Sequence, residues 1–218
     1  MLNSIKYFLR NPLEIPINII IRLPYFKFIR ETKDYQSQIN FQFWFIQKIL
    51  NIGRNKNAYW PVHFTSLIVN KKNIYAGIDT CPGLMNGCYI QGIGTIFIDD
   101  YTQIGPHVSI ISSNHNLHDT RKHIPSHVKI GKYCWIGAGA KIMPGVTLGD
   151  FTIVGAGAIV TKSFEEGHCV IGGNTAKILK KLDPDKCVRF EHKIPYYGYL
   201  NKSQFTKYRK KYLKVEND

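Results

Sequence analysis

The chain has 218 residues, which is long enough for a single domain with a substantial core. Its formal net charge of +14 favours anionic ligands, nucleic acid or anionic membrane surfaces as partners, and composition alone does not choose among them. The 5 cysteines are an odd number and include no Cys-x-x-Cys pair, which argues against a disulfide framework and predicts reduced, intracellular thiols.

Residues 1–65 predict a helical segment that differs in character from the rest of the chain. Charged residues and prolines interrupt its apolar pieces too often for a bilayer span, and no signal-peptide cleavage site follows them, so we expect a cytoplasmic protein. The spacing predicts a short helix over residues 13–29, broken by its prolines, and an apolar-rich helix over residues 35–52 with Gly53 near its end. These helices either cover the open edge of the structure that follows or form an aromatic, basic anchor at a membrane surface.

Residues 130–165 carry a repeat in which an aliphatic residue returns at every sixth position. This period fits neither a helix nor one long strand, but it fits short strands that turn a corner after each hexapeptide. Three such strands make a triangular coil of about 18 residues, and stacked coils bury a continuous aliphatic column. A glycine follows the aliphatic residue in several repeats and is expected to relax the backbone at the corner. The aliphatic positions are Ile130, Ile136, Ile142, Leu148, Val154 and Val160.

The same period starts before residue 130 and is interrupted twice. A shift of two residues between Ile96 and Ile98 predicts a bulge or short insertion near residues 92–97. The long gap between Ile110 and Ile130 predicts that residues 111–129, rich in Ser, Asn and His, leave the coil as a loop. After Val160 the period fades, and residues 66–182 form the predicted repeat domain. The earlier aliphatic positions are Ile78, Leu84, Ile90, Ile96, Ile98, Ile104 and Ile110.

Residues 183–218 form an aromatic and basic tail. It is rich in tyrosine and lysine, and the spacing predicts a helix over residues 203–214 whose basic face is solvated.

Residues 112–123 of the predicted loop hold three histidines, His115, His118 and His123, close to Asp119, and His127 follows shortly after. Imidazoles beside a carboxylate can bind a metal, but their spacing matches no fixed zinc pattern and no thiolate pair joins them, so we expect no metal site. A single histidine can instead act as a general base, because imidazole, with a pKa of about 6.5, takes up and returns a proton at neutral pH.

Six short segments carry a further pattern: residues 110–115 (IISSNH), 133–138 (YCWIGA), 144–146 (PGV), 155–158 (GAGA), 160–162 (VTK) and 173–177 (GNTAK). Together they resemble the hexapeptide-repeat O-acetyltransferases, in particular the branch with galactoside, maltose and capsular-sugar acetyltransferases, over residues 74–180. The resemblance implies a mainly β fold, a left-handed parallel β-helix with an N-terminal helical segment and a short helical tail. It also implies a homotrimer, acetyl-CoA as donor, and active sites between neighbouring subunits. The left-handed winding of the β-helix is inferred from the family alone, since crossover connections between parallel strands are ordinarily right-handed.

The resemblance also assigns site residues. The family's catalytic histidine follows Asn114 and is therefore His115, and the backbone N–H of Ala138 is the donor to the oxyanion. Asn114 and Asp119 are expected at the acceptor, where Asp119 either orients His115 or caps the loop. Lys177 and Lys180 are expected to contact the phosphates of acetyl-CoA. Relatives often carry arginine at these two positions, and lysine keeps the positive charge but cannot form the two parallel hydrogen bonds of a guanidinium. The expected acyl-CoA contacts are Trp135, Ala138, Ala156, Thr161, Lys162, Lys177 and Lys180.

The sequence therefore predicts an acetyl-CoA-dependent O-acetyltransferase that acts on a sugar hydroxyl in cell-surface polysaccharide biosynthesis, without a metal. Such intermediates are anionic and often lipid-linked, so a cytoplasmic enzyme that contacts the inner face of the membrane fits the basic, aromatic periphery. An antibiotic acetyltransferase and a non-catalytic trimeric β-helix scaffold remain as alternatives. Nucleic-acid binding is not expected, because the basic residues follow no known reader fold.

Overall fold

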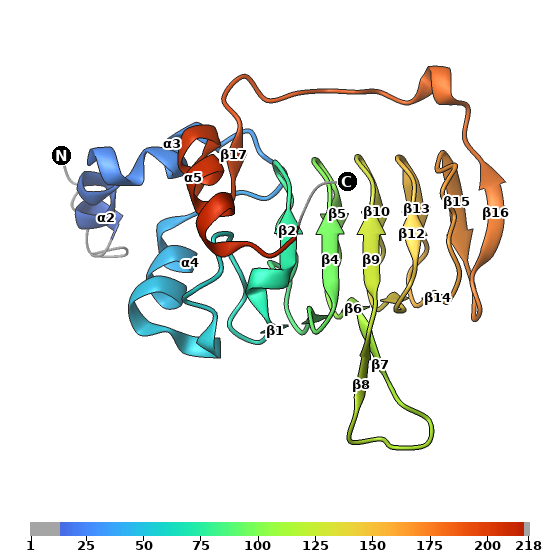
Figure 1. Ribbon diagram of the computed structural model, residues 1–218. Coiled ribbons are helices and arrows are strands. Elements are labelled where there is room, and N and C mark those ends of the chain that lie inside the picture. Colours follow the sequence, from blue (N-terminus) through green and yellow to red (C-terminus); the bar gives the residue numbers. More distant parts are fainter. Residues whose placement is uncertain (1–13, 216–218) are drawn as a thin grey trace.

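The computed structural model describes residues 14–215, and its centre is a parallel β-helix of three sheets (Figure 1). Sheet A contains β1 (Leu67–Val69), β3 (Tyr89–Gln91), β6 (Ser109–Ile111), β11 (Lys141–Ile142) and β14 (Ile159–Val160). Sheet B contains β2 (Ile74–Ala76), β4 (Thr95–Ile98), β9 (His127–Ile130) and β12 (Thr147–Leu148). Sheet C contains β5 (Gln103–Ile104), β10 (Trp135–Ile136), β13 (Thr152–Val154), β15 (Cys169–Gly172) and β16 (Lys177–Lys181). The chain visits A, B and C in turn, so each round has an A/B, a B/C and a C/A corner.

The core of this repeat stack is the aliphatic column that the period predicts. In sheet C, Ile136 pairs in register with Ile104 and Val154, and its side chain has no exposed surface. Each fully buried aliphatic side chain of this kind stabilises the fold by about 1.5–3 kcal/mol relative to exposure. The earliest predicted repeat is misplaced, because Ile78 and Leu84 are only partly buried while Ile68 and Ile74 fill the column.

The glycines that directly follow the buried aliphatic residues, such as Gly131 and Gly149, are needed for space rather than for an unusual backbone angle. A Cβ at Gly131 would lie 2.5 Å from Asp150 Oδ1, and one at Gly149 would lie 2.1 Å from the carbonyl oxygen of Glu165. The backbone of the next coil therefore passes too close for any side chain. Left-handed angles occur at other corner positions: Tyr101, Tyr133 and Phe151 at the B/C corner have φ of 62°, 55° and 56°, and Gly139 and Gly157 at the C/A corner have φ of 69° and 68°.

The two predicted interruptions both lie at the A/B corner. The two extra residues fall between β3 and β4, within the predicted range. Residues 111–129 are not a loop as predicted: Ile111 ends β6, and β9 begins at His127. Between them, β7 (Ser113–His115) and β8 (His123–Pro125) form an antiparallel hairpin that projects away from the stack (Figure 1). The backbone pairing of the hairpin makes this arm a defined structure.

The N-terminal helices are shorter than the spacing predicts. They are α2 (Glu14–Ile20), η1 (Pro24–Phe26), α3 (Lys27–Glu31), α4 (Phe41–Phe45), η2 (Ile46–Leu50) and η3 (Ile52–Arg54), with η4 (Lys71–Asn73) inside the stack. The break at Pro24 agrees with the prediction, whereas the helix predicted from residue 35 begins only at residue 41. The buried Asp79 carboxylate explains the difference, because it accepts hydrogen bonds from the backbone N–H groups of Gln36 and Ser37. Asn40 then caps α4 through the N–H of Phe43, at 2.8 Å.

The C-terminal tail returns along the whole stack. After β16, residues 183–195 form an extended strap that leads back to the first coil (Figure 1). The strap includes the short helix η5 (Pro184–Lys186) near its start. At the first coil, β17 (Tyr196–Tyr197), β18 (Leu200–Asn201) and α5 (Lys202–Tyr212) follow. The predicted tail helix is thus present, but it is not only a solvated element, since Phe205 is buried and stacks 3.9 Å from the Tyr197 ring.

Residues 14–66 and 196–215 pack together and cover the first coil; we call this unit the cap. Gln47 joins its parts, because its amide donates to the carbonyl of Trp60 at 3.0 Å and its carbonyl accepts from the Tyr199 hydroxyl at 2.8 Å. Trp60 is fully buried at the end of the aliphatic column. Between residues 14 and 215, no helix has the length and apolar character needed to cross a membrane.

Candidate active site

His115 lies on the exposed hairpin, at the end of β7. Its Nδ1 is 2.6 Å from the carbonyl oxygen of Thr120. A carbonyl can only accept, so Nδ1 carries the proton and Nε2 keeps its lone pair. The His123 ring packs 4.4 Å away and limits rotation of the imidazole. This arrangement suits a general base, because the free nitrogen is the one that can take a proton.

Asp119 does not contact His115. Its carboxylate accepts from Arg121 Nε at 2.8 Å and lies 3.5 Å from Lys122 Nζ, and the guanidinium holds the pKa of this carboxyl below its usual range. Of the two alternatives for Asp119, these contacts favour the carboxylate that caps the loop, and the group that contacts His115 Nδ1 is the Thr120 carbonyl. Asn114 is exposed on β7, opposite Ile124 of β8, and lies next to the imidazole in sequence.

Ala138 lies at the C/A corner, in a tight turn after β10. Its side chain is exposed, and its carbonyl accepts from the Gly157 N–H at 2.8 Å. Its own N–H donates to no other residue in the described part of the chain. The turn one coil further, at Ala156, has the same free N–H. A Cβ added at Gly157 would meet nothing within 4 Å, so this corner is open to a ligand.

Trp135 projects from β10, and 58 % of its side chain is exposed. It borders a groove of about 540 Å³ whose other side is formed by Val188 and Phe190 of the strap. The hydroxyl of Tyr133 donates to the Phe190 carbonyl at 2.8 Å and holds the strap there. This contribution of the strap could not be predicted from the sequence, because no local pattern indicates where residues 183–195 lie.

The predicted acyl-CoA contacts fall into three places on one chain. Trp135, Ala138 and Ala156 are at or beside the C/A corner. Thr161 and Lys162 follow β14 at the A/B corner, the same corner from which the His115 hairpin projects. Lys177 and Lys180 are exposed on β16, which pairs antiparallel with β15 and closes the stack. Sheet A separates the first two groups, so a single chain does not bring His115 and Ala138 together.

The described residues, 14–215, contain no group of three or more His, Cys, Asp or Glu side chains placed to hold a metal. Cys81, Cys88, Cys134 and Cys169 are buried without disulfides, and Cys134 fills an inward position of the stack.

Similarity to known proteins supports the repeat stack and its fold. Residues 127–162 match the family model described as bacterial transferase hexapeptide (six repeats). The chain carries the bacterial transferase hexapeptide repeat. A galactoside acetyltransferase, solved in complex with coenzyme A, has the same fold, with 27 % identity and a TM-score of 0.53 over 67 % of this chain and 76 % of that one. A hexapeptide-repeat containing acetyltransferase from Vibrio cholerae gives 23 % identity and a TM-score of 0.50, over 63 % of this chain and 85 % of that one.

A curated relative, nodulation protein L of Rhizobium leguminosarum bv. viciae, is 40 % identical over 65 residues, which are 28 % of this chain and 34 % of the relative. The match thus spans about a third of that protein. The predicted resemblance to hexapeptide-repeat acetyltransferases is confirmed, as is the fold class, a mainly β left-handed parallel β-helix with helical segments at both ends. The hexapeptide-repeat match does not extend to the cap or the strap.

Proposed function

We propose that this protein transfers an acetyl group from acetyl-CoA to a hydroxyl group of a sugar. The observation that carries the proposal is His115, whose Nδ1 is fixed on the Thr120 carbonyl so that Nε2 is free on an exposed arm. The similar galactoside acetyltransferase, which shares the fold and binds coenzyme A, supports both the donor and the acceptor class.

In the proposed reaction, His115 Nε2 takes the proton of the acceptor hydroxyl as its oxygen attacks the thioester carbonyl. The N–H of Ala138 donates to the oxygen that gains negative charge, which is stabilised because the donor is fixed in the turn beforehand. His115 then returns the proton to the leaving thiolate. The acetyl group moves directly from sulfur to oxygen, so no metal and no covalent enzyme intermediate is required.

The chain's own residues fit an extended donor. The exposed turns at Ala138 and Ala156 carry only small side chains and two N–H groups without partners among the described residues. Trp135 supplies an exposed aromatic face beside them. Thr161 and Lys162 would border the same ligand from another corner, and Lys177 and Lys180 would supply positive charge for its phosphates.

We further propose that the protein acts as a homotrimer. His115 and Ala138 lie at different corners of one chain, and the proposed chemistry needs both within hydrogen-bond reach of the same carbonyl. Two copies placed side by side can bring the A/B corner of one next to the C/A corner of the other. Closed three-fold symmetry would repeat this cleft and leave no unpaired corner.

The acceptor is proposed to be a sugar of a cell-surface polysaccharide intermediate in the cytoplasm, at the inner face of the membrane. Support comes from the net charge of +14 and from exposed apolar side chains on the cap, such as Ile49, Leu50 and Ile52. These features suit an anionic, lipid-linked intermediate.

The test is thiol release from acetyl-CoA by the purified protein with a panel of sugars, glycolipids and antibiotics. We expect release with a sugar acceptor and a drop of about 10²–10⁴ in kcat for His115→Ala, with the KM for acetyl-CoA nearly unchanged. His118→Ala, on the same arm, is the matched control and should retain activity. A His115→Ala protein with more than half the turnover of the wild type would overturn the assignment.

A further inference from the structure

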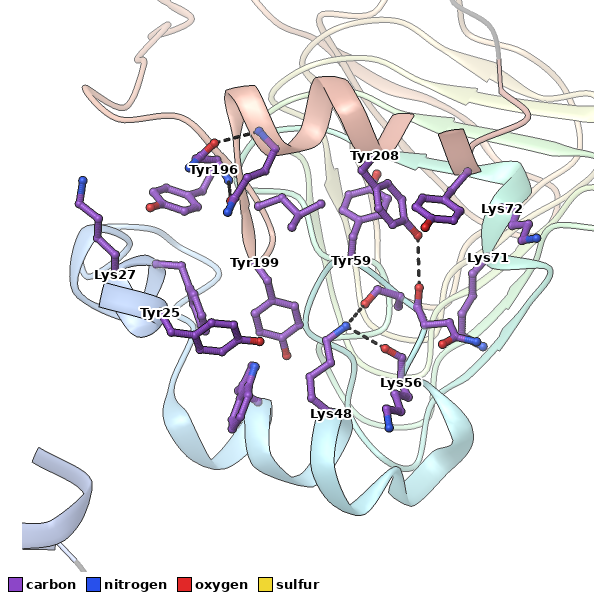
Figure 2. Close-up of a pocket in the computed structure, with 18 of the residues that line it drawn as sticks. Tyr25, Lys27, Lys48, Lys56, Tyr59, Lys71, Lys72, Tyr196, Tyr199 and Tyr208 are labelled. Atoms are coloured by element: carbon purple, nitrogen blue, oxygen red, sulfur yellow. Dashed lines mark hydrogen bonds between the residues drawn. The ribbon is translucent and has the colours of Figure 1, made fainter. Parts of the chain in front are cut away.

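The cap contains a cavity of about 750 Å³ between the N-terminal helices, residues 56–59, η4 and α5 (Figure 2). It lies outside the hexapeptide match, and none of the residues assigned to acyl transfer lines it. The proposed transfer reaction therefore does not account for it.

The walls of this cavity are strongly basic. Five lysines line it, namely Lys27, Lys48, Lys56, Lys71 and Lys72, and the lining includes no Asp or Glu. Lys27 is neutralised by Glu31 at 3.1 Å. The other four make no ion pair with any of residues 14–215, and Figure 2 shows them gathered on one side of the opening. Four unneutralised ammonium groups in one cavity make a site for an anion.

Two of these lysines are held in the wall rather than free in solvent. The Lys48 ammonium donates to the carbonyls of Lys56, at 2.8 Å, and Ala58. Lys71 donates to the carbonyl of Ile68 at 2.9 Å. Burial lowers the pKa of Lys48 to about 8, with the nearby charge of Lys56 as a second cause, and burial also lowers the pKa of Lys71. Keeping such charges without a carboxylate costs stability, and a bound anion would offset that cost.

The rest of the lining is aromatic and amide-bearing. Lys48 Nζ lies 4.9 Å from the centre of the Tyr199 ring. At the mouth, Tyr25 is 67 % exposed and contacts Trp44 edge to face at 5.8 Å. Asn57, next to Lys56 in sequence, adds an amide group to the lining. Aromatic faces and a few polar groups are the usual means of binding an organic ligand, so the anion is expected to carry an organic group.

We propose that this cavity binds a phosphate-bearing ligand, with Lys48, Lys56, Lys71 and Lys72 around the phosphate and the tyrosines against its organic part. Several lysines around one point suit a multiply charged phosphate or diphosphate, which accepts hydrogen bonds from many directions. The phosphate can belong to a soluble compound or to a lipid headgroup. The exposed Ile49 and Leu50 follow Lys48 in η2 and would meet the acyl region in the second case.

The experiment compares Lys56→Gln/Lys72→Gln with Lys33→Gln/Lys207→Gln. All four lysines are exposed, both pairs remove two positive charges, and Lys33 and Lys207 do not line the cavity. Binding of inorganic pyrophosphate is measured by calorimetry. Binding to vesicles of phosphatidylcholine and phosphatidylglycerol, in a ratio of about 7:3, is measured by sedimentation.

We expect the Lys56→Gln/Lys72→Gln variant, the cavity pair, to lose about tenfold or more in affinity for one of the two probes. The Lys33→Gln/Lys207→Gln variant, the control pair, should bind both probes about as tightly as the wild type. A loss for pyrophosphate identifies a soluble ligand, and a loss for vesicles alone identifies a lipid headgroup. Equal losses in both pairs would show a mere net-charge effect and overturn the proposal, as would a wild type that binds neither probe. Thiol release by the cavity pair should equal that of the wild type, so failure here is separate from failure of the proposed reaction.

Discussion

The repeat stack and the cap are built on different principles. In the stack, each residue packs on the equivalent residue of the next coil, as Ile136 does on Ile104 and Val154. In the cap, hydrogen bonds join Tyr35 and Glu31 to Tyr196, across 161 and 165 residues of sequence. The stack is thus a periodic support for the proposed acyl-transfer groups, whereas the cap depends on the return of the tail and adds a basic cavity of its own.

The largest expected effect is at the corner of the stack that holds Ala138, the proposed oxyanion donor. Ala138→Pro removes the N–H proposed to donate to the oxyanion, and kcat should fall by about 10²–10³ in the thiol-release assay. The fold should survive, because Pro106 already occupies the equivalent corner one coil earlier, given the pairing of Gln103 with Trp135.

Ala156→Pro is the matched control, since it changes the next corner in the same way. It should raise the KM for acetyl-CoA, because the Ala156 N–H is proposed to face the donor, and leave kcat at saturating acetyl-CoA close to the wild-type value. If the two proline variants lost kcat equally, Ala138 would have no special role.

A cavity in the aliphatic column should lower the stability of the stack. Ile136→Ala is expected to lower the free energy of unfolding by about 2–5 kcal/mol, because the side chain is fully buried between neighbouring coils. Denaturant titration measures this. A loss below about 1 kcal/mol would mean that the coils do not support one another as described.

A smaller and more local effect is expected in the cap. Gln47→Ala leaves the Trp60 carbonyl and the Val62 N–H without their partner, which costs about 1–3 kcal/mol. Hydrogen exchange should speed up in residues 196–201 and not in β10. The exposed Gln42→Ala serves as the control, and faster exchange in β10 as well would contradict the separation of cap and stack.

The smallest expected effect is a pH-dependent change in stability at Lys48. The folded pKa of Lys48, about 8, is below that of an unfolded lysine, 10.5, so the unfolded state binds more protons between these values and Lys48 destabilises the fold most below pH 8. Lys48→Met should therefore be more stable than the wild type near pH 7, by on the order of 1 kcal/mol. The difference in stability between this variant and the wild type should shrink as pH rises above 8, which thermal unfolding at several pH values can detect. A difference that does not change with pH would contradict the lowered pKa of Lys48.

Much of the stack could be predicted from the sequence, because its period reflects contacts between equivalent residues of successive coils. The position of His115 on an ejected arm could also be predicted from the gap in the period. The regular hairpin of β7 and β8 could not, since pairing of Asn114 with Ile124 leaves no mark in a polar sequence. The pairing of Asp119 with Arg121 in place of His115 depends on the shape of that hairpin.

Prediction was weakest in the cap, where partners are distant in sequence. Helical spacing extends back to residue 35, but Asp79 captures the backbone of Gln36 and Ser37 and delays the helix. The basic cavity combines Lys48, Lys56 and Lys71 with Tyr199, and no local pattern shows that these residues meet. Tertiary contacts therefore override the local propensity here.

The central claim is that one acyl-transfer site uses His115 of one copy and Ala138 of another. Co-expression of His115→Ala and Ala138→Pro chains with different tags, followed by purification of mixed oligomers, tests it most directly. With sites between copies of a trimer, each mixed trimer has one of its three clefts with both intact groups, so activity should return to about a third of the wild-type value. Mixed oligomers as inactive as either parent would contradict the account.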